Sequence, residues 1–368
     1  MSGYIWYSAG SDVTGPKLAE ALGFNHGKKT PKIEDFNVLV GWGCKAESRQ
    51  LYDPQKFKSC VEKGDLRILN NPEAITKARN KVNLFTDLKH SGIQIPGFFS
   101  IKGISPSNIV ESIEKAIQDG LLQLPCAGFN EYNRDEPVFC WTKEDLNRIV
   151  TINKSRKKES VKIHYFRSLF QGTEYRIHVF RDEVIHAEQK ILSKDPIKST
   201  ASSLYRRLSK KKDMQASEKD VQLIVAEIAS DLMKGPSHLQ RSVKHGWQLS
   251  PVVMNDIPAE VLSTAINALE VAGLDMGAVS IILEENTPIV TNVISAPGLN
   301  DQQMALYVDA IKEFTESNTV KPRNIATKKS TIGTERASTE IVAKITRRVR
   351  MGKISQKKAE EVLKVLTE

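Results

Sequence analysis

The stretch "GLDMGAVSIILEENTPIVTNVISAPGLN" spans residues 273–300 and decides the fold of this chain. A glycine at the end of a helix precedes an apolar run, a polar turn and a second apolar run, which predicts a β-hairpin followed by a loop. The outline is that of a hairpin able to hold a catalytic metal. However, residues 286–300 contain no acidic residue, so the carboxylates of such a site are not where the outline requires them.

The composition is that of an ordinary globular protein. The chain has 368 residues, of which 40% are hydrophobic and 26% charged, and this length allows two or three domains. No apolar run approaches the roughly 18 residues that span a membrane, and the N-terminus lacks signal-peptide features. The cysteines show no CxxC spacing, and we expect reduced thiols in an intracellular protein. They are Cys44, Cys60, Cys126 and Cys140.

The net charge of +9 is unevenly distributed. Residues 153–162, 206–212 and 323–353 carry much of the excess. Solvated loops and helix faces are the simpler interpretation, and contact with nucleic acid or with the interior of a virion is the alternative. Aromatic residues do not alternate with these basic runs, so the sequence shows no platform on which bases could stack.

The N-terminal segment alternates strands with helices. The runs "YIWYSA", "FNVLVGWG" and "LRILN" read as strands and "GPKLAEALG" as a short helix, which predicts a small parallel α/β unit. The Gly41–Gly43 turn follows a strand at the end where open α/β sheets bind ligands. Asn71 and Pro72 predict the start of a helical region that Gly92 ends.

A second predicted hairpin lies in the middle of the chain, where "TEYRIHVF" and "VIHAEQKIL" flank a short turn. Because side chains alternate across a strand, one face of this hairpin carries six ionisable groups. This face is either a solvated surface with cross-strand ion pairs or the polar floor of a cleft. The six groups are Glu174, Arg176, His178, His186, Glu188 and Lys190.

The order of these segments resembles the ATP-grasp superfamily, and most closely the carboxylate–amine ligase type carried by phages. The matching motifs are "NPEAITKARNKVNLFTDLKHSGIQIP", "EYRIHVF…VIHAEQK", "GLDMGAV" and "APGL", over about residues 1–315. The resemblance implies an α/β and α+β fold: an N-terminal parallel α/β pre-domain (1–100) and a two-lobed ATP-grasp-like body (101–316). A polar insertion or mobile loop (194–245), a linker (317–338) and a basic two-helix hairpin (339–368) complete the predicted organisation.

The resemblance also implies where a metal site would lie. In the family, an Asp, a Glu and an Asn on the last hairpin hold Mg²⁺. Ser280, Asn292 and Ile294 stand at those positions here. None of the three carries a charge, whereas Mg²⁺ favours carboxylate oxygen. We therefore expect no metal ligand in this chain, and Mg²⁺ to be an unlikely cofactor.

Other parts of the family's nucleotide pocket are present. Glu174, Arg176 and Lys190 match its central strands, and Arg241 matches an arginine before a Gly–Trp pair, here Gly246–Trp247. The flexible glycine-rich flap is missing, and Lys162 is a weaker candidate in the following strand. These side chains could bind ATP or another anion. Alternatively, they serve sheet packing and ion pairing with Glu174 and Glu188.

Three functions follow as hypotheses. The first is a catalytically degenerate ATP-grasp protein that acts by binding or as a structural component of a phage particle, in the host cytoplasm or the virion. The second is an active ATP-dependent carboxylate–amine ligase. The third is a nucleic-acid-associated protein. The expected partners are other phage or virion proteins, contacted through the C-terminal helices, or nucleic acid; no membrane partner is expected.

Overall fold

The computed structural model describes most of the first 316 residues. The described ranges are 2–44, 53–130, 137–155, 162–198, 201–202, 225–226, 239, 241–242 and 246–316. Most of the predicted insertion (194–245), together with the predicted linker (317–338) and C-terminal hairpin (339–368), lies outside these residues. None of the described helices is long and apolar enough to cross a membrane.

The N-terminal sheet is parallel, as predicted. Its strand order is β2-β1-β3-β4. Buried apolar side chains fill both faces of its central strands, the pattern expected when helices cover a parallel sheet. The strands are β1 (Gly3–Tyr7), β2 (Asn25–Gly27), β3 (Val38–Trp42) and β4 (Arg67–Leu69). The helices of this segment are η1 (Ala9–Ser11), α1 (Thr14–Leu22), η2 (Ile33–Asp35) and α2 (Pro54–Glu62).

The helical region from Pro72 to Gly92 is divided, whereas the sequence predicted one helix. Asn71 caps α3 (Pro72–Arg79) by accepting a bond from Glu73 N at 2.8 Å. Asn80 then adopts an extended ψ of 100° and caps the next helix, α4 (Lys81–His90), through Asn83 N. Asparagine favours such a cap because its side chain competes for backbone donors.

A four-stranded antiparallel sheet follows, with strand order β5-β8-β6-β7. Helices α5 and α6 pack against each other, and their apolar residues form one core with β6 and β7. The strands are β5 (Phe98–Ser100), β6 (Cys126–Phe129), β7 (Val138–Cys140) and β8 (Tyr165–Ser168), and the helices are α5 (Ile109–Gln118) and α6 (Glu144–Ser155). All four cysteines are free, and Cys60 alone is not fully buried.

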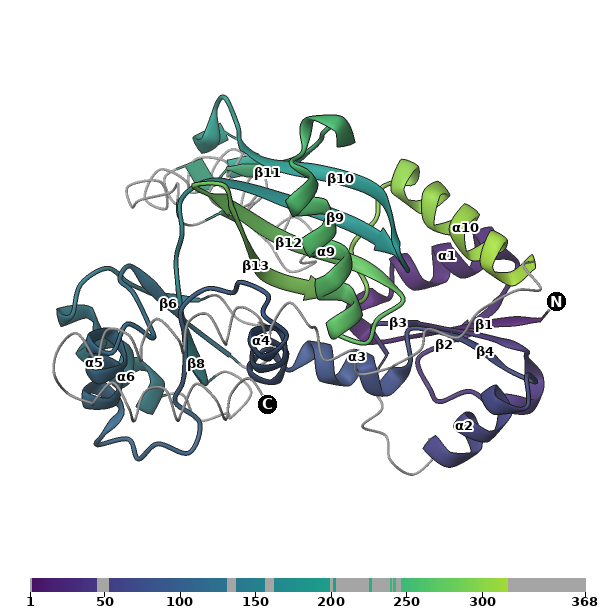
Figure 1. The fold of residues 1–368 in the computed structure, drawn as a ribbon, viewed down its shortest axis with the longest axis horizontal. Coiled ribbons are helices and arrows are strands. Elements are labelled where there is room, and N and C mark those ends of the chain that lie inside the picture. Colours follow the sequence, from purple (N-terminus) through teal and green to yellow (C-terminus); the bar gives the residue numbers. More distant parts are fainter. Residues whose placement is uncertain are drawn as a thin grey trace, which may run out of the picture. The chain divides into compact units, whose positions relative to one another are not determined.

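Both predicted hairpins belong to one five-stranded antiparallel sheet of order β11-β10-β9-β12-β13. Helix α9 covers its apolar face (Figure 1), where Ile177, Val279 and Val290 pack with Val261 and Ala265. The strands are β9 (Thr173–Phe180), β10 (Glu183–Leu192), β11 (Trp247–Pro251), β12 (Met276–Glu284) and β13 (Thr287–Ile294). The remaining elements are η5 (Met254–Asp256), α9 (Ala259–Val271) and α10 (Asp301–Glu316).

The other face of this sheet carries the six ionisable groups, and its centre is not a solvated surface. His178 is 0% exposed, Glu188 6% and His186 8%. Helix α10 covers this end of the face, where Tyr307 contacts His178. The interpretation as a solvated antiparallel face is therefore wrong for these residues, because they are covered by helix α10, whose Tyr307 lies 129 residues after His178.

Candidate functional site

The final hairpin brings the three predicted metal positions to one region of the polar face. Glu285 and Asn286 form its turn with positive φ angles of 47° and 67°, as two-residue hairpin turns require. The register pairs Ser280 directly with Asn292. The next pair is Ile281 with Val290, so Thr291 is the extra residue of a β-bulge. Thr291 Oγ1 donates to Ser280 O at 3.1 Å and fixes this irregularity.

A polar row crosses the sheet at this point. Arg176 of β9 is paired in register with Ser280 on one side and with Glu188 of β10 on the other. Ser280 is 5% exposed. The Arg176 Nε and Asn292 Oδ1 atoms are buried and have no hydrogen-bond partner among the described residues. Unpaired buried donors and acceptors are rare in native proteins, and they point to a ligand or ordered water at this row.

Three of the predicted binding residues form a cluster beside the row. Glu174 Oε1 accepts from Lys190 Nζ at 2.9 Å, and Glu174 Oε2 lies 3.7 Å from Arg241 Nη1. Arg241 also donates to the carbonyls of Phe170 and Gly172. Burial lowers the pKa of Lys190 and of Arg241, although Glu174 opposes the shift in both cases. The cluster thus holds two basic side chains and one carboxylate in a largely buried place.

Lys162 lies elsewhere. It stands in the segment before β8, and its carbonyl accepts a bond from Asn130 Nδ2 at 3.1 Å. The five-stranded sheet, which carries Glu174, Arg176 and Lys190, does not include this segment.

Lys81, at the start of α4, is a candidate that sequence reasoning missed. Its side chain is 6% exposed, and its Nζ donates to Ala78 O at 3.0 Å and to Val293 O at 2.8 Å. Burial lowers its pKa to about 7, and the charges of Arg167 and Arg79 add to the shift. A sequence signal was available: Lys81 lies three and seven residues before the core residues Leu84 and Leu88, on the apolar face of the helix.

Arg167 is a second missed residue, and it reaches the same strand. Its Nη1 donates to Thr291 O at 2.8 Å, and its guanidinium lies 4.6 Å from the centre of the Phe129 ring. The two carbonyls that Lys81 and Arg167 contact, those of Val293 and Thr291, flank Asn292 in the chain. Two basic side chains therefore contact the backbone of β13 one residue before and one residue after Asn292.

The residues at this row fit a polyphosphate anion better than a metal ion. Ser280 and Asn292 offer neutral oxygens, and Ile294 offers none. No group of three His, Cys, Asp or Glu side chains able to hold a metal occurs in the part of the chain that the structure describes. In contrast, Arg176 lies within the row, and Lys81 and Arg167 contact the backbone of β13 on the two neighbours of Asn292. Charge-assisted donors of this kind bind phosphate oxygens strongly.

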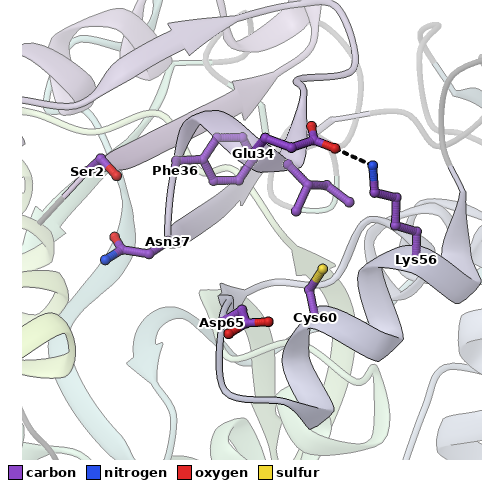
Figure 2. A pocket seen from close by; sticks show the side chains of 8 residues that line it. Ser2, Glu34, Phe36, Asn37, Lys56, Cys60 and Asp65 are labelled. Carbon is purple, nitrogen blue, oxygen red and sulfur yellow. Dashed lines mark hydrogen bonds and ion pairs between the residues drawn. The ribbon is translucent and has the colours of Figure 1, made fainter.

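A pocket of about 370 Å³ lies on the N-terminal segment, away from these residues in the chain. Figure 2 shows Cys60 and Lys56 of α2 on one side of it, Phe36 and Glu34 on the other, and an ion pair between Glu34 and Lys56. Its polar lining residues are exposed. The pocket is therefore an open surface depression.

Comparison with known proteins identifies the fold, through short sequence matches and longer structural ones. No family model matches the chain. Probable alpha-L-glutamate ligases of Saccharophagus degradans and Vibrio vulnificus are 39% and 42% identical to it over 72 residues, which are 19% of this chain. The match covers 24% of each relative, so the chain spans about a quarter of the length of these curated proteins.

Solved structures match over most of the chain. The ATP-grasp ligase PsnB complexed with a minimal precursor has a TM-score of 0.51 at 12% identity, covering 85% of this chain and 99% of that one. A D-alanine–D-alanine ligase from Bacillus anthracis has a TM-score of 0.53 at 10% identity, covering 85% and 92%. The same enzyme complexed with ATP gives 0.51 at 11% identity, covering 85% and 96%. This chain therefore has the ATP-grasp fold.

Proposed function

We propose that this protein binds the triphosphate of ATP, or a similar polyphosphate anion, on the polar face of its five-stranded sheet, and that it does not catalyse ligation. The proposal agrees with the fold, because two of the matching proteins were solved with ATP or with Mg and ADP. The proposal treats nucleotide binding and catalysis separately, because cations bind the phosphates whereas carboxylates hold the catalytic metal. The phosphate-binding cations are present here, whereas the carboxylates that would hold a catalytic metal are not.

One observation carries the proposal: Arg176 Nε and Asn292 Oδ1 in this row are buried and unpaired, and the predicted metal positions Ser280 and Asn292 carry no charge. In this fold, Mg²⁺ would neutralise phosphate charge and promote phosphoryl transfer, which requires charged oxygen ligands. Because Ser280 and Asn292 are neutral, the basic side chains of the protein would have to neutralise the phosphate charge. Lys81 and Arg167 at the edge of β13 and Arg176 within the sheet would neutralise the phosphates directly.

The Lys81 ammonium supports binding in a further way. The interactions that set its pKa are burial and two neighbouring arginines, with no carboxylate among them. A buried cation without a counter-ion is costly, and an anion that pairs with it removes that cost. Lys81 is thus arranged to gain stability when an anion arrives.

The test measures binding and turnover in the same preparations. We expect ATP to bind, and we expect no release of phosphate or ADP above background with Mg²⁺ in the presence of mixed amino acids and short acidic peptides. ATP turnover that disappears in both Arg176→Ala and Lys190→Ala would overturn the proposal. That result would instead establish an active ligase or ATPase.

A matched pair of variants tests whether binding uses the proposed residues. Lys81→Met should weaken ATP binding about tenfold or more, the loss expected for a buried charge-assisted contact. Lys89→Met removes an exposed lysine from the same helix and should leave the affinity unchanged. Equal affinities for the two variants would place the anion elsewhere.

A further inference from the structure

The four-stranded antiparallel sheet contains a pair of cysteines that the proposed function does not use. Cys126 of β6 and Cys140 of β7 are directly paired in register, and register partners point to the same face of a sheet. Both side chains are 0% exposed and belong to the core that α5 and α6 form with this sheet. The two thiols contact each other there. The fold therefore holds two oxidisable groups together in one apolar environment.

The register places this pair within the geometry that a disulfide requires. Directly opposed residues of antiparallel strands have Cα atoms roughly 4.5 or 5.5 Å apart, depending on the type of pair. A disulfide joins residues whose Cα atoms lie about 4.4–6.8 Å apart. Cys126 and Cys140 can therefore be linked without a shift of the strands, whichever type of pair they form. Cys44 and Cys60 belong to the N-terminal segment instead.

The contacts of the two thiols distinguish their reactivity. The contact with Cys126 lowers the pKa of Cys140, although burial opposes this shift. The same contact raises the pKa of Cys126, and burial adds to the shift. Because the thiolate is the nucleophilic form of cysteine, Cys140 is the first of the two to attack an oxidant. Cys140 Sγ also donates to Thr142 O at 3.1 Å, and water can replace this bond because Thr142 is exposed.

Oxidation of these buried thiols requires a small oxidant and a local opening of the sheet. Among the described strands, β7 pairs with β6 alone, and it has three residues. A short edge strand of this kind opens locally at a lower free energy than the whole protein unfolds. Hydrogen peroxide is little larger than water. An opening limited to β7 is therefore enough to bring the oxidant to Cys140.

We propose that Cys126 and Cys140 form a redox pair, which hydrogen peroxide converts into an intramolecular disulfide and a thiol reductant restores. The sulfur of Cys140 attacks one peroxide oxygen and the O–O bond breaks, which yields a sulfenic acid and one water. The sulfur of Cys126 then attacks Cys140 Sγ, the S–O bond breaks and a second water leaves. Together the thiols lose two electrons and two protons, and the peroxide accepts them. The inference does not depend on nucleotide binding.

The disulfide would hold the edge of the sheet in place. Residues 127–139, thirteen in all, lie between the two cysteines. A cross-link that closes such a loop restricts the conformations available to the opened strand. On its other side β6 pairs with β8, where Ala127 lies opposite Arg167. Oxidation would therefore fasten β7 to the sheet that carries one of the proposed phosphate-binding residues.

Peptide mass spectrometry of the folded full chain tests the pair directly. Reduced protein is treated with hydrogen peroxide, the remaining thiols are alkylated, and the chain is digested without reductant. We expect a linked pair of peptides that contain Cys126 and Cys140 and that separate after treatment with dithiothreitol. Hydrogen exchange at the β7 amides should slow about tenfold or more on oxidation, because the cross-link limits the opening of this strand.

Two variants and one unfolded sample serve as controls. Cys60→Ser removes the cysteine that is not fully buried and should leave the linked peptides unchanged. Cys126→Ala should abolish the linkage and leave Cys140 to oxidise further to the sulfinic acid. Wild-type protein oxidised in urea should give several cysteine pairings, because the unfolded chain no longer places Cys126 opposite Cys140. The wild-type comparison decides the question even if Cys126→Ala does not fold.

A folded protein in which peroxide oxidises Cys60 while Cys126 and Cys140 remain free thiols would overturn the proposal. Linkage of Cys126 or Cys140 to another cysteine in the folded chain would also overturn it. Unchanged hydrogen exchange at β7 in the linked protein would contradict the effect of the disulfide on this edge of the sheet.

Discussion

Lys81 is the clearest example of a side chain whose environment opposes its charge. It is buried, donates to two backbone carbonyls and has two arginines nearby. A helix-periodic pattern predicts an apolar residue at its position. A buried lysine in such a place is costly, and the proposed anion would offset that cost.

The depressed pKa of Lys81 predicts a specific dependence of stability on pH. The folded protein releases this proton near pH 7, whereas the unfolded chain keeps it until its usual value of about 10.4. The unfolded state therefore binds more protons between these values, and stability rises with pH across the window, by up to about 1.4 kcal/mol per pH unit. Urea unfolding of wild type and Lys81→Met at pH 7, 8 and 9 checks this. A difference between the two that does not grow with pH would contradict the assignment.

At the residue scale, the sequence identified part of the candidate site. It selected Glu174, Lys190 and Arg241, and the structure brings these three together. It did not select Lys81 or Arg167. Both reach β13 from other segments, and their partners are backbone carbonyls. Every residue type has a backbone carbonyl, so the sequence of β13 does not indicate that these contacts form. Such contacts are a property of the folded chain alone.

At the scale of elements, the hairpin of β12 and β13 was predictable because alternation and turn residues are local signals. Its bulge at Thr291 was not, since a register shift depends on the neighbouring strand. The break between α3 and α4 at Asn80 was also missed, because helix-forming residues flank it on both sides. The single sequence signal for a helix cap at that point was Asn80 itself.

The hairpin supports a gain-of-function prediction. The triple variant Ser280→Asp, Asn292→Glu, Ile294→Asn should fold, because Arg176 is the register partner of residue 280 and can pair with a new carboxylate. It should make nucleotide binding depend on Mg²⁺, which titrations in Mg²⁺ and in EDTA would show. The single variant Ile294→Asn is the control for folding. A triple variant that unfolds would show that these positions serve packing alone.

Asn70 joins the N-terminal sheet to this hairpin and offers a prediction about stability. Its side chain accepts from Asp275 N and Met276 N and donates to Met276 O and Ser295 O. It is fully buried and has a positive φ of 56°, which asparagine tolerates better than most residues. Asn70→Ala should cost about 2–4 kcal/mol in unfolding free energy. The neighbouring helix cap Asn71→Ala should cost about 1 kcal/mol, and equal losses in calorimetry would contradict this role.

At the scale of the whole molecule, the order of segments predicted the ATP-grasp fold, and the structure confirms it. The burial of the polar face could not be predicted from the hairpin of β9 and β10 alone. Its alternating charges suit a solvated surface equally well, and the covering residue Tyr307 lies 129 positions after His178. Whether the six ionisable groups are exposed to solvent or buried in a binding site therefore depends on the packing of a helix that is distant in the sequence.

The central claim is that this fold binds a nucleotide through its own cations, without a metal held by the protein. Isothermal titration with ATP, once with Mg²⁺ and once in EDTA, tests it most directly. The account predicts binding in both conditions, with dissociation constants within about threefold of each other, a difference below 1 kcal/mol. Binding that appears only with Mg²⁺, or no binding in either condition, would contradict it.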